Sequence, residues 1–312
     1  MDRSTGPEGT FVLAAFTVAV ILGGANFLAV RFSNRELPPL WGAGLRFSLA
    51  AVLFVVIALS LRLVWPRGRE LVLTVIYGLL AFALFYALMY WALVRVTAGV
   101  ATVVMAVVPL VTLLLAAGQR LERLSGRAVA GSLLALTGLV WMALGSTEVV
   151  LPLTPLLAML AAAICVGQSV IIGKRVSGNH PAMTNAVALV TGATALLLMS
   201  VVAREQWALP RQTEVVWSLV YLVTLGSVGL FVLVLLVVRR WTASATSYMF
   251  VLFPVVTMVL GAWLADESVT VHGAIGAAAV CAGVWFGAVS PAARRSATAA
   301  PVPAASPIPE PG

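Results

Sequence analysis

The chain contains an internal repeat. Residues 95–142 align without a gap on residues 240–287, at an offset of 145 positions. The matching residues include Arg95/Arg240, Thr97/Thr242, Pro109/Pro254, Thr112/Thr257, Glu122/Glu267, Gly131/Gly276 and Gly138/Gly283. Upstream, at an offset of 143, Arg31 aligns with Lys174 and Pro38 with Pro181. The two halves of the chain are therefore expected to fold into similar units.

Ten apolar runs follow one another along the chain, and a transmembrane helix needs about 20 such residues to cross the hydrocarbon core of a bilayer. The runs cover residues 11–30, 39–61, 71–93, 97–118, 126–145, 152–173, 182–203, 215–238, 243–265 and 271–290. With 62% hydrophobic and only 10% charged residues, the sequence predicts an all-α integral membrane protein with ten transmembrane helices.

Five runs fall in each copy of the repeat. An odd number of crossings places the two copies upside down relative to each other, as in many secondary transporters. We expect a first repeat at residues 11–145 and a second at 152–290. Residues 291–312 are rich in Pro, Ala and Ser without apolar periodicity, which predicts a disordered tail.

The distribution of basic residues predicts the orientation. With both termini inside, thirteen Lys and Arg residues fall on the cytoplasmic side and five on the opposite side. Cytoplasmic loops are enriched in these residues, so we expect both termini in the cytoplasm. The net charge of +8 comes mainly from arginines between the apolar runs and indicates contact with anionic lipids rather than nucleic acid.

The repeated block resembles the EamA family of the drug/metabolite transporter superfamily. Its elements are Thr97-Ala98, Pro109, Leu121-Glu122-Arg123-Leu124, Gly131 and Gly138, which recur as Thr242-Ala243, Pro254, Asp266-Glu267-Ser268-Val269, Gly276 and Gly283. The segment Gly23–Phe27 and the arginine at position 46 also resemble family positions, although Leu189 stands where a second arginine would fall. The resemblance implies a ten-helix carrier in the bacterial inner membrane that moves small metabolites, often outward, by alternating access.

Arg46 is the most conspicuous candidate for substrate binding. An arginine at the bilayer centre costs roughly 2.5–3.5 kcal/mol on insertion scales, so an interaction should offset it. It could bind a carboxylate in a central cavity. Alternatively, it could snorkel to the headgroups or pair with Glu36 in the adjacent loop.

Other polar side chains in the apolar runs are also candidates for the cavity wall. Asn26 and Gln168 could contact a substrate or form interhelical hydrogen bonds. Tyr86 could contribute to an aromatic wall, while Tyr90 and Trp91 could equally be interfacial anchors. The fourth and ninth runs are rich in hydroxyl groups, and from them we add Thr102, Ser247 and Tyr248.

Pro109 and Pro254 are expected in the middle of equivalent helices, where each removes a backbone hydrogen bond and kinks the helix. The paired kinks could form a hinge or only shape the packing. Glu122 and Glu267 each lie in a turn, where pairing with arginines or shaping the turn is favoured over proton coupling. The glycines of the fifth and tenth runs could pack within one molecule or form a homodimer.

The sequence predicts no metal site, no cofactor and no catalytic residue. Neither His180 nor His272 has a partner at metal-ligand spacing, and no phosphate-binding glycine loop is present. We expect a secondary-active exporter of a small polar or amphipathic metabolite, amino-acid-like or similar, with the substrate and membrane lipids as its partners. The alternatives are a multidrug efflux carrier and, less favoured, a membrane enzyme acting on lipid-linked substrates. Neither the substrate nor the coupling ion follows from the sequence.

Overall fold

Helices account for all the regular secondary structure in the part of the chain that the computed structural model describes. That part comprises residues 7–93, 105, 107–122, 124–144, 153–176, 178–264 and 271–289. The first half contains α1 (Pro7–Ser33), α2 (Pro39–Ser60), α3 (Gly68–Gly78), η1 (Leu79–Leu84), α4 (Phe85–Leu93), α6 (Val108–Gly118) and α7 (Gly126–Leu144). The second contains α8 (Leu153–Arg175), α9 (Pro181–Val202), α10 (Thr213–Val223), η2 (Thr224–Gly229), α11 (Leu230–Arg240), α12 (Ala243–Ser247), α13 (Met249–Leu264), α14 (Val271–Val284) and η3 (Trp285–Val289). The predicted all-helical fold is confirmed.

Seven helical segments in the described residues are long and apolar enough to cross a membrane. They coincide with the first three predicted runs and with the sixth to ninth. Three shorter apolar helices, Val108–Gly118, Gly126–Trp141 and Val271–Gly287, lie where the fourth, fifth and tenth runs were expected. The chain is thus a multi-pass membrane protein, while the count of ten crossings stays a prediction. The expected tail, residues 291–312, lies outside the described residues.

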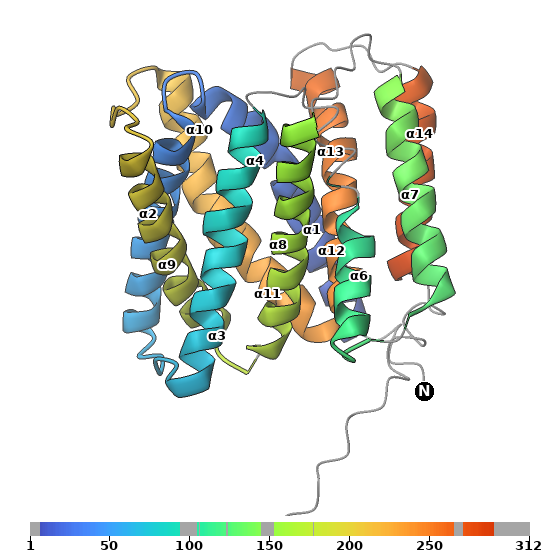
Figure 1. The fold of residues 1–312 in the computed structure, drawn as a ribbon, viewed down its shortest axis with the longest axis horizontal. Helices are drawn as coiled ribbons and strands as arrows, with labels where there is room; N and C mark the ends of the chain where they lie inside the picture. Colours follow the sequence, from blue (N-terminus) through green and yellow to red (C-terminus); the bar gives the residue numbers. More distant parts are fainter. Residues whose placement is uncertain are drawn as a thin grey trace, which may run out of the picture.

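The two halves run in opposite directions through the bundle. In Figure 1, α1 begins at the lower end, whereas its counterpart α8 begins at the upper end. Counterpart helices from the two halves also pack against each other, α2 against α9 and α7 against α14. By the charge distribution of the sequence, the lower end is the predicted cytoplasmic side.

Glycines bring α7 close to α14 and to η3, which continues it. A Cβ atom added to Gly131 would lie 2.6 Å from the Cα of Gly287, and one added to Gly138 would lie 2.7 Å from the carbonyl oxygen of Gly276. Small residues allow helices to approach in this way. These glycines pack within one molecule, and the alternative of a homodimer stays a prediction.

Two π-helices, η1 in the first half and η2 in the second, lie at the same place in the repeat. The π-helix η1 lies within the continuous span Gly68–Ala92, and η2 lies within Thr213–Arg240. Adding the repeat offset of 145 to residues 79–84 gives residues 224–229, the bounds of η2. A π-turn disturbs the regular hydrogen bonding of a helix and is frequent at functional sites.

The two prolines expected at equivalent kinks lie in different positions within their helices. Pro254 is inside α13, as predicted. Pro109 is in the first turn of α6, because α6 begins at Val108. The prediction of a mid-helix position is therefore wrong for Pro109, since a proline in the first turn displaces no helical hydrogen bond. The second half is interrupted nearby, between the end of α12 at Ser247 and the start of α13 at Met249. The hinge role of both prolines stays a prediction.

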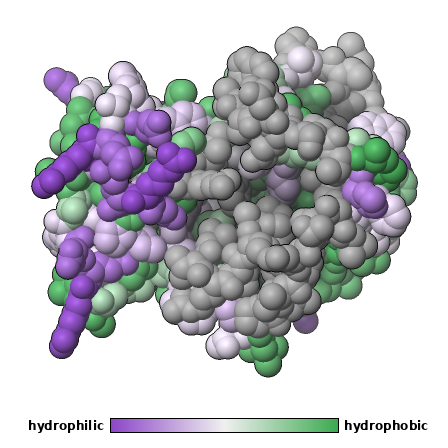
Figure 2. Space-filling model, turned by 90° about the horizontal axis from the view of Figure 1, so that it is seen from above, coloured by the Kyte–Doolittle hydropathy of each residue, from purple (hydrophilic) through white to green (hydrophobic). Residues whose placement is uncertain are grey.

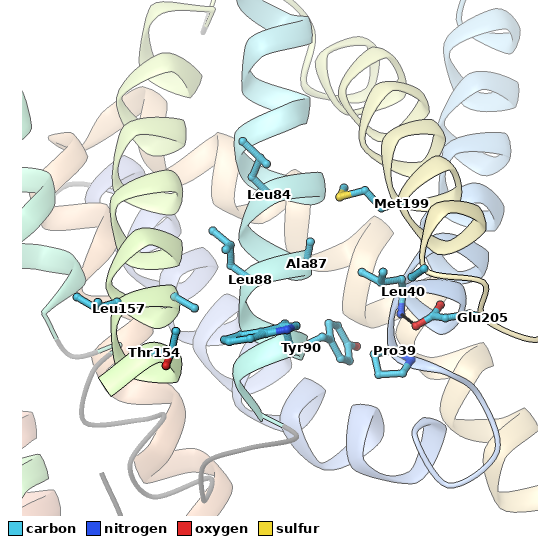
Figure 3. Close-up of a pocket in the computed structure, with 13 residues that line it drawn as sticks. Pro39, Leu40, Leu84, Ala87, Leu88, Tyr90, Thr154, Leu157, Met199 and Glu205 are labelled. Carbon is cyan, nitrogen blue, oxygen red and sulfur yellow. Dashed lines mark hydrogen bonds between the residues drawn. The ribbon is translucent and has the colours of Figure 1, made fainter. Parts of the chain in front are cut away.

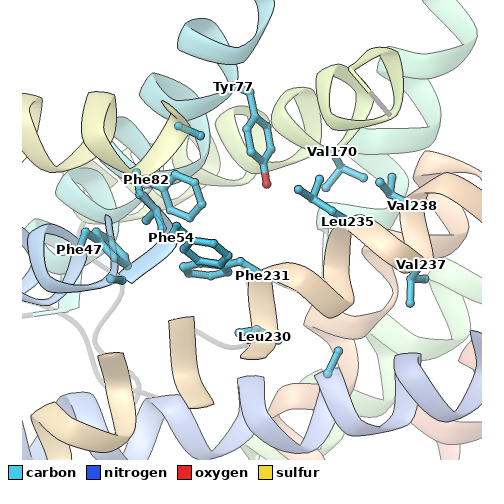
Figure 4. Packing of buried hydrophobic residues seen from close by; sticks show 14 of the residues in the cluster. Phe47, Phe54, Tyr77, Phe82, Val170, Leu230, Phe231, Leu235, Val237 and Val238 are labelled. Atoms are coloured by element: carbon cyan, nitrogen blue, oxygen red, sulfur yellow. The ribbon is translucent and has the colours of Figure 1, made fainter. Parts of the chain in front are cut away.

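An aromatic cluster fills the centre of the bundle (Figure 4). The ring of Phe82 lies 4.7 Å from that of Phe231 and 5.4 Å from that of Phe47, measured between centroids. All three side chains are buried. They come from η1, α11 and α2, so the cluster joins the two halves of the chain.

Charged side chains gather at the ends of the bundle. Figure 2 shows hydrophilic residues over α2, α9 and α10 at the upper end. There Arg35 forms an ion pair of 2.8 Å with Glu214, and both side chains are largely exposed. Glu36 accepts hydrogen bonds from the backbone amides of Arg211 and Gln212. These contacts hold together the loops that follow α1 and α9.

Candidate functional site

Arg46 is buried within the bundle instead of snorkelling to its surface. Its side chain is 1% exposed. The Nε atom donates a hydrogen bond of 2.9 Å to Oγ of Ser227, and Nη2 donates one of 2.8 Å to the carbonyl oxygen of Gly226. The alternative expectation of a pair with Glu36 is wrong, because that carboxylate accepts from the loop amides instead.

Asn26 reaches the same carbonyl oxygen from α1. Its Nδ2 atom donates to the oxygen of Gly226 at 3.0 Å, and the residue is 7% exposed. A Cβ atom on Gly226 would clash with Oδ1 of Asn26, so only glycine permits this approach. The structure thus brings Asn26 and Arg46 together on the π-helix η2.

One polar atom on each of these two side chains makes no hydrogen bond. Nη1 of Arg46 and Oδ1 of Asn26 are buried and have no hydrogen-bond partner among the described residues. Nor does any described carboxylate lie within ion-pair distance of Arg46. A buried polar group without a partner costs roughly 1–3 kcal/mol, and more when charged. The site therefore presents one unused cationic donor and one unused acceptor.

Aromatic rings cover the guanidinium group of Arg46. Its Cζ lies 5.8 Å from the ring centroid of Tyr86 and 5.0 Å from that of Phe47. The rings of Tyr86 and Phe47 are themselves in edge-to-face contact at 4.7 Å. Cation–π contact stabilises the charge by about 0.5–2 kcal/mol. Tyr86 is thus close enough to Arg46 to help shape a common site.

The polar cluster is not repeated at the equivalent positions of the two halves. Leu189 occupies the position equivalent to Arg46, and Phe82 the position equivalent to Ser227. Both are buried in the main hydrophobic cluster. The two halves therefore share a framework, while the buried charge belongs to only one of them.

Gln168 lies apart from this cluster, in a chain of amide contacts. The side-chain oxygen of Gln168, Oε1, accepts a hydrogen bond of 2.8 Å from Nε2 of Gln119. Oε1 of Gln119 in turn accepts one of 2.7 Å from Nη2 of Arg175. These residues connect α6 to the last turns of α8. The observed contact is the interhelical hydrogen bond that was the alternative to substrate binding.

Two of the predicted hydroxyl residues serve local structure. Oγ of Ser247 donates to the carbonyl oxygen of Ser244 within α12. The hydroxyl of Tyr248 donates to the carbonyl oxygen of Ala128 at 2.7 Å and lies 2.8 Å from Oγ of Ser132. Tyr248 thus packs against α7, and the structure brings neither residue to Arg46. Thr102 lies outside the described residues.

Two carboxylates bind the beginnings of helices. Oε1 of Glu122 accepts from the amides of Ala243 and Ser244 at the start of α12, and Oε2 accepts from the hydroxyl of Ser244. Glu205 accepts from the amides of Leu40 and Trp41 at the start of α2, at 3.1 and 2.7 Å. A carboxylate at a helix N-terminus satisfies free amides and complements the helix dipole. The structural role expected for Glu122 fits this geometry, and Glu267 lies outside the described residues.

A lateral groove of about 780 Å³ lies near the upper end, over α4 and between α8 and α9. Figure 3 shows Leu88 and Leu157 toward one side, Met199 and Leu40 toward the other, and Tyr90 between them. Its lining is mainly apolar and includes neither Arg46 nor Asn26. Tyr90 connects it to the site, because the ring of Tyr90 lies 6.1 Å from that of Tyr86.

Three residues of interest were not predicted from the sequence. Gly226 and Ser227 supply the acceptors for Arg46, yet a glycine and a serine in an apolar run carry no distinctive signal. Asn185 is fully buried in α9, and neither atom of its amide has a partner among the described residues. Asn185 could have been selected as a candidate from the sequence, because it is an amide side chain inside an apolar run. No group of three or more metal-ligating side chains occurs within the described residues.

The sequence matches a known family over both halves. The model of the EamA-like transporter family matches residues 10–144 and again residues 153–288. The chain belongs to this family. The resemblance recognised in the repeated motifs is thereby confirmed, and the chain is a transporter-type membrane protein with two repeated halves.

Relatives and a solved structure agree with this assignment. A protein of Streptantibioticus cattleyicolor named "Probable terminal-alkyne amino-acid exporter" is 28% identical over 239 residues, covering 75% of this chain and 80% of its own length. The "Uncharacterized inner membrane transporter YedA" of Escherichia coli K12 is 28% identical over 264 residues, covering 83% of this chain and 84% of its own. One crystal structure superposes with a TM-score of 0.76 at 21% identity, over 92% of this chain and 98% of that chain, which shows a common fold.

Proposed function

We propose that the protein is a secondary-active exporter of a small amphipathic metabolite of the amino-acid type. It works by alternating access in the bacterial inner membrane, with both termini in the cytoplasm. The family membership and the inverted halves support this mechanism, and the distribution of basic residues supports the orientation.

The observation that carries the proposal is the pair of unused atoms beside Gly226. Nη1 of Arg46 is a cationic donor, and Oδ1 of Asn26 is an acceptor. An α-amino acid carries a carboxylate and an ammonium group on one carbon atom. The carboxylate accepts from Arg46 while the ammonium group donates to Asn26, and the two unsatisfied atoms are satisfied together.

The energetics favour an anionic head group over a cationic drug. The buried guanidinium has no described carboxylate to neutralise it, so an incoming carboxylate gains a charge-assisted hydrogen bond of about 1.5–3 kcal/mol. A lipophilic cation would meet like charge at the same place. The arrangement thus supports amino-acid-like cargo more than multidrug efflux.

The relatives support the same class of cargo. The name of the Streptantibioticus cattleyicolor relative assigns an amino acid to that exporter. We extend to the present chain only the class, an amino acid with an apolar side chain. Since these relatives are named as transporters, they also favour transport over the enzymatic alternative.

The test is export of a radiolabelled mixture of L-amino acids, measured as uptake into inside-out membrane vesicles. Arg46→Leu is expected to lower uptake at least tenfold, because a charge-assisted hydrogen bond is lost. The variant should still fold, because the carbonyl oxygen of Gly226 keeps its hydrogen bond from Asn26 and the hydroxyl of Ser227 keeps its bond to the carbonyl oxygen of Leu222. The matched control is Arg35→Leu, which removes an exposed arginine at the same end of the bundle. Uptake by Arg46→Leu at the wild-type rate would contradict the proposal.

A further inference from the structure

Asn185 is a second buried polar group in the membrane region without a partner. Its side chain is 0% exposed, and both Nδ2 and Oδ1 lack hydrogen bonds to any described residue. An amide group can donate two hydrogen bonds and accept two. Leaving all of them unmade inside an apolar bundle is costly, and a leucine of similar size would avoid the cost. The chain keeps an amide where packing alone favours a hydrocarbon side chain.

The position of Asn185 mirrors that of Arg46 on a single pair of helices. The helices α2 and α9 pack together and run in opposite directions, and each contains 22 residues, or about 33 Å. Arg46 lies about 10 Å from the start of α2 at the upper end, and Asn185 about 6 Å from the start of α9 at the lower end. The two unsatisfied groups are therefore near opposite ends of the same pair.

The face of α9 that carries Asn185 is directed toward α3 and η1. Residues 185, 188 and 192 have the spacing of one helix face. A Cβ atom on Gly192 would clash with the side chain of Phe82, and one on Gly78 would clash with the backbone of Ala188. Asn185 continues this face by one turn toward the lower end.

The aromatic cluster lies between the two polar groups. Phe82 contacts α9 at Gly192, two turns above Asn185, and its ring contacts that of Phe47, the residue after Arg46. Phe231 completes the apolar barrier from α11 (Figure 4). A polar head group that moves between the two ends of the bundle must pass this barrier, with Arg46 and Asn26 on one side of it and Asn185 on the other.

We propose that Asn185 is a second substrate-binding residue, which receives the carboxylate and ammonium groups of the cargo on the cytoplasmic side of the Phe82–Phe231 barrier. Its Nδ2 donates to the carboxylate and its Oδ1 accepts from the ammonium group, as Arg46 and Asn26 do on the other side. The inference rests on the proposed function, because the head group is that of an amino acid. It adds a binding step before the cargo reaches Arg46.

Asn185→Leu separates this role from a structural one. The variant removes an unsatisfied amide, so the midpoint of thermal unfolding in detergent should rise or stay constant. Uptake of the radiolabelled L-amino acid mixture into inside-out vesicles should nevertheless fall about tenfold, mainly through a higher KM. A tenfold loss of affinity is what the loss of one hydrogen bond to the substrate is expected to cause. The control is Asn179→Leu, in the turn before α9, whose Nδ2 also lacks a described partner but lies outside the membrane region. It should transport as the wild type does.

Wild-type uptake by Asn185→Leu would overturn the inference, while reduced uptake at full stability supports it. If the leucine variant fails to fold, Asn185→Ser and Asn185→Ala provide a second comparison at nearly equal volume. The serine variant keeps a donor and an acceptor and should transport faster, and equal rates would overturn the inference. Failure of the proposed function looks different: the wild type would then transport no amino acid, or Arg46→Leu would transport normally.

Discussion

Asn26 and Arg46 donate hydrogen bonds to the same carbonyl oxygen, that of Gly226, at 3.0 and 2.8 Å. The two donors come from α1 and α2 in the first half of the chain, and the acceptor comes from η2 in the second. The contact therefore exists only when both halves are assembled. Arg46 is the one cationic side chain that is buried in the described part of the chain, and this contact joins the two halves at it.

Gly226→Ala is predicted to damage transport without changing any polar side chain. The new Cβ atom would clash with Oδ1 of Asn26 and push the side chain of Asn26 away from η2. Since the position of Asn26 is set by this approach, we expect a loss of export of roughly tenfold. Uptake into inside-out vesicles measures it.

The control for this prediction is Gly118→Ala, at the end of α6. A Cβ atom there meets nothing within 4 Å, so this variant should transport normally. Equal activity in Gly226→Ala and Gly118→Ala would show that the approach of Asn26 to η2 is dispensable.

Glu205→Ala is predicted to destabilise the protein by about 1–2 kcal/mol, which is a typical cost of losing a helix N-cap. The carboxylate of Glu205 binds the amides of Leu40 and Trp41, and Ser200 also donates to it. Thermal unfolding in detergent measures the loss. Glu214→Ala removes a carboxylate from an exposed ion pair and should change the midpoint little. An equal shift in both variants would contradict the capping role.

Gly283→Val is predicted to disrupt the contact between α7 and α14. A Cβ atom at Gly283 would lie 2.6 Å from the backbone nitrogen of Ala135, so the helices must separate. We expect a loss of stability of several kcal/mol, as for other overpacked contacts, and reduced amounts of folded protein in the membrane. Gly126→Ala, which meets nothing within 4 Å, is the control. A normal thermal midpoint for Gly283→Val would refute the close packing of this pair.

The orientation can be tested with single cysteines. In a background with Cys165→Ala and Cys281→Ala, a cysteine replacing Arg211 should react with a membrane-impermeant maleimide added to intact spheroplasts. A cysteine replacing Arg69 should react only after the membrane is permeabilised. These expectations follow from placing the loop after α9 outside and the first turn of α3, which contains Arg69, inside. The reverse pattern of labelling would invert the proposed topology.

Much of the scaffold follows from the sequence because hydropathy and repetition are local signals. The first run was predicted at 11–30 and the helix spans Pro7–Ser33, so polar ends extend it beyond the apolar core. The seven described spans fall on predicted runs for the same reason. The repeat offset also identifies α2 and α9, and α7 and α14, as counterparts, while their packing against each other is seen only in the structure.

The site was only partly predictable because its geometry depends on distant backbone. Arg46 and Asn26 stood out as polar residues in apolar runs. Their common partner did not, since Gly226 is 180 residues from Arg46 and contributes a carbonyl group. The π-turn that contains it leaves no mark in a hydropathy pattern. Tyr248 shows the converse: its hydroxyl suggested a cavity wall, but the approach of α7 gave it backbone and serine partners.

The most direct test of the central claim is whether the carrier requires a free carboxylate on its cargo. In proteoliposomes preloaded with the best-transported L-amino acid, unlabelled free acid and its methyl ester can be compared as competitors of labelled exchange. We predict that the free acid competes and the ester, which cannot pair with Nη1 of Arg46, does not. Equal competition by the ester and the acid would contradict the assignment of Arg46 as the carboxylate-binding residue.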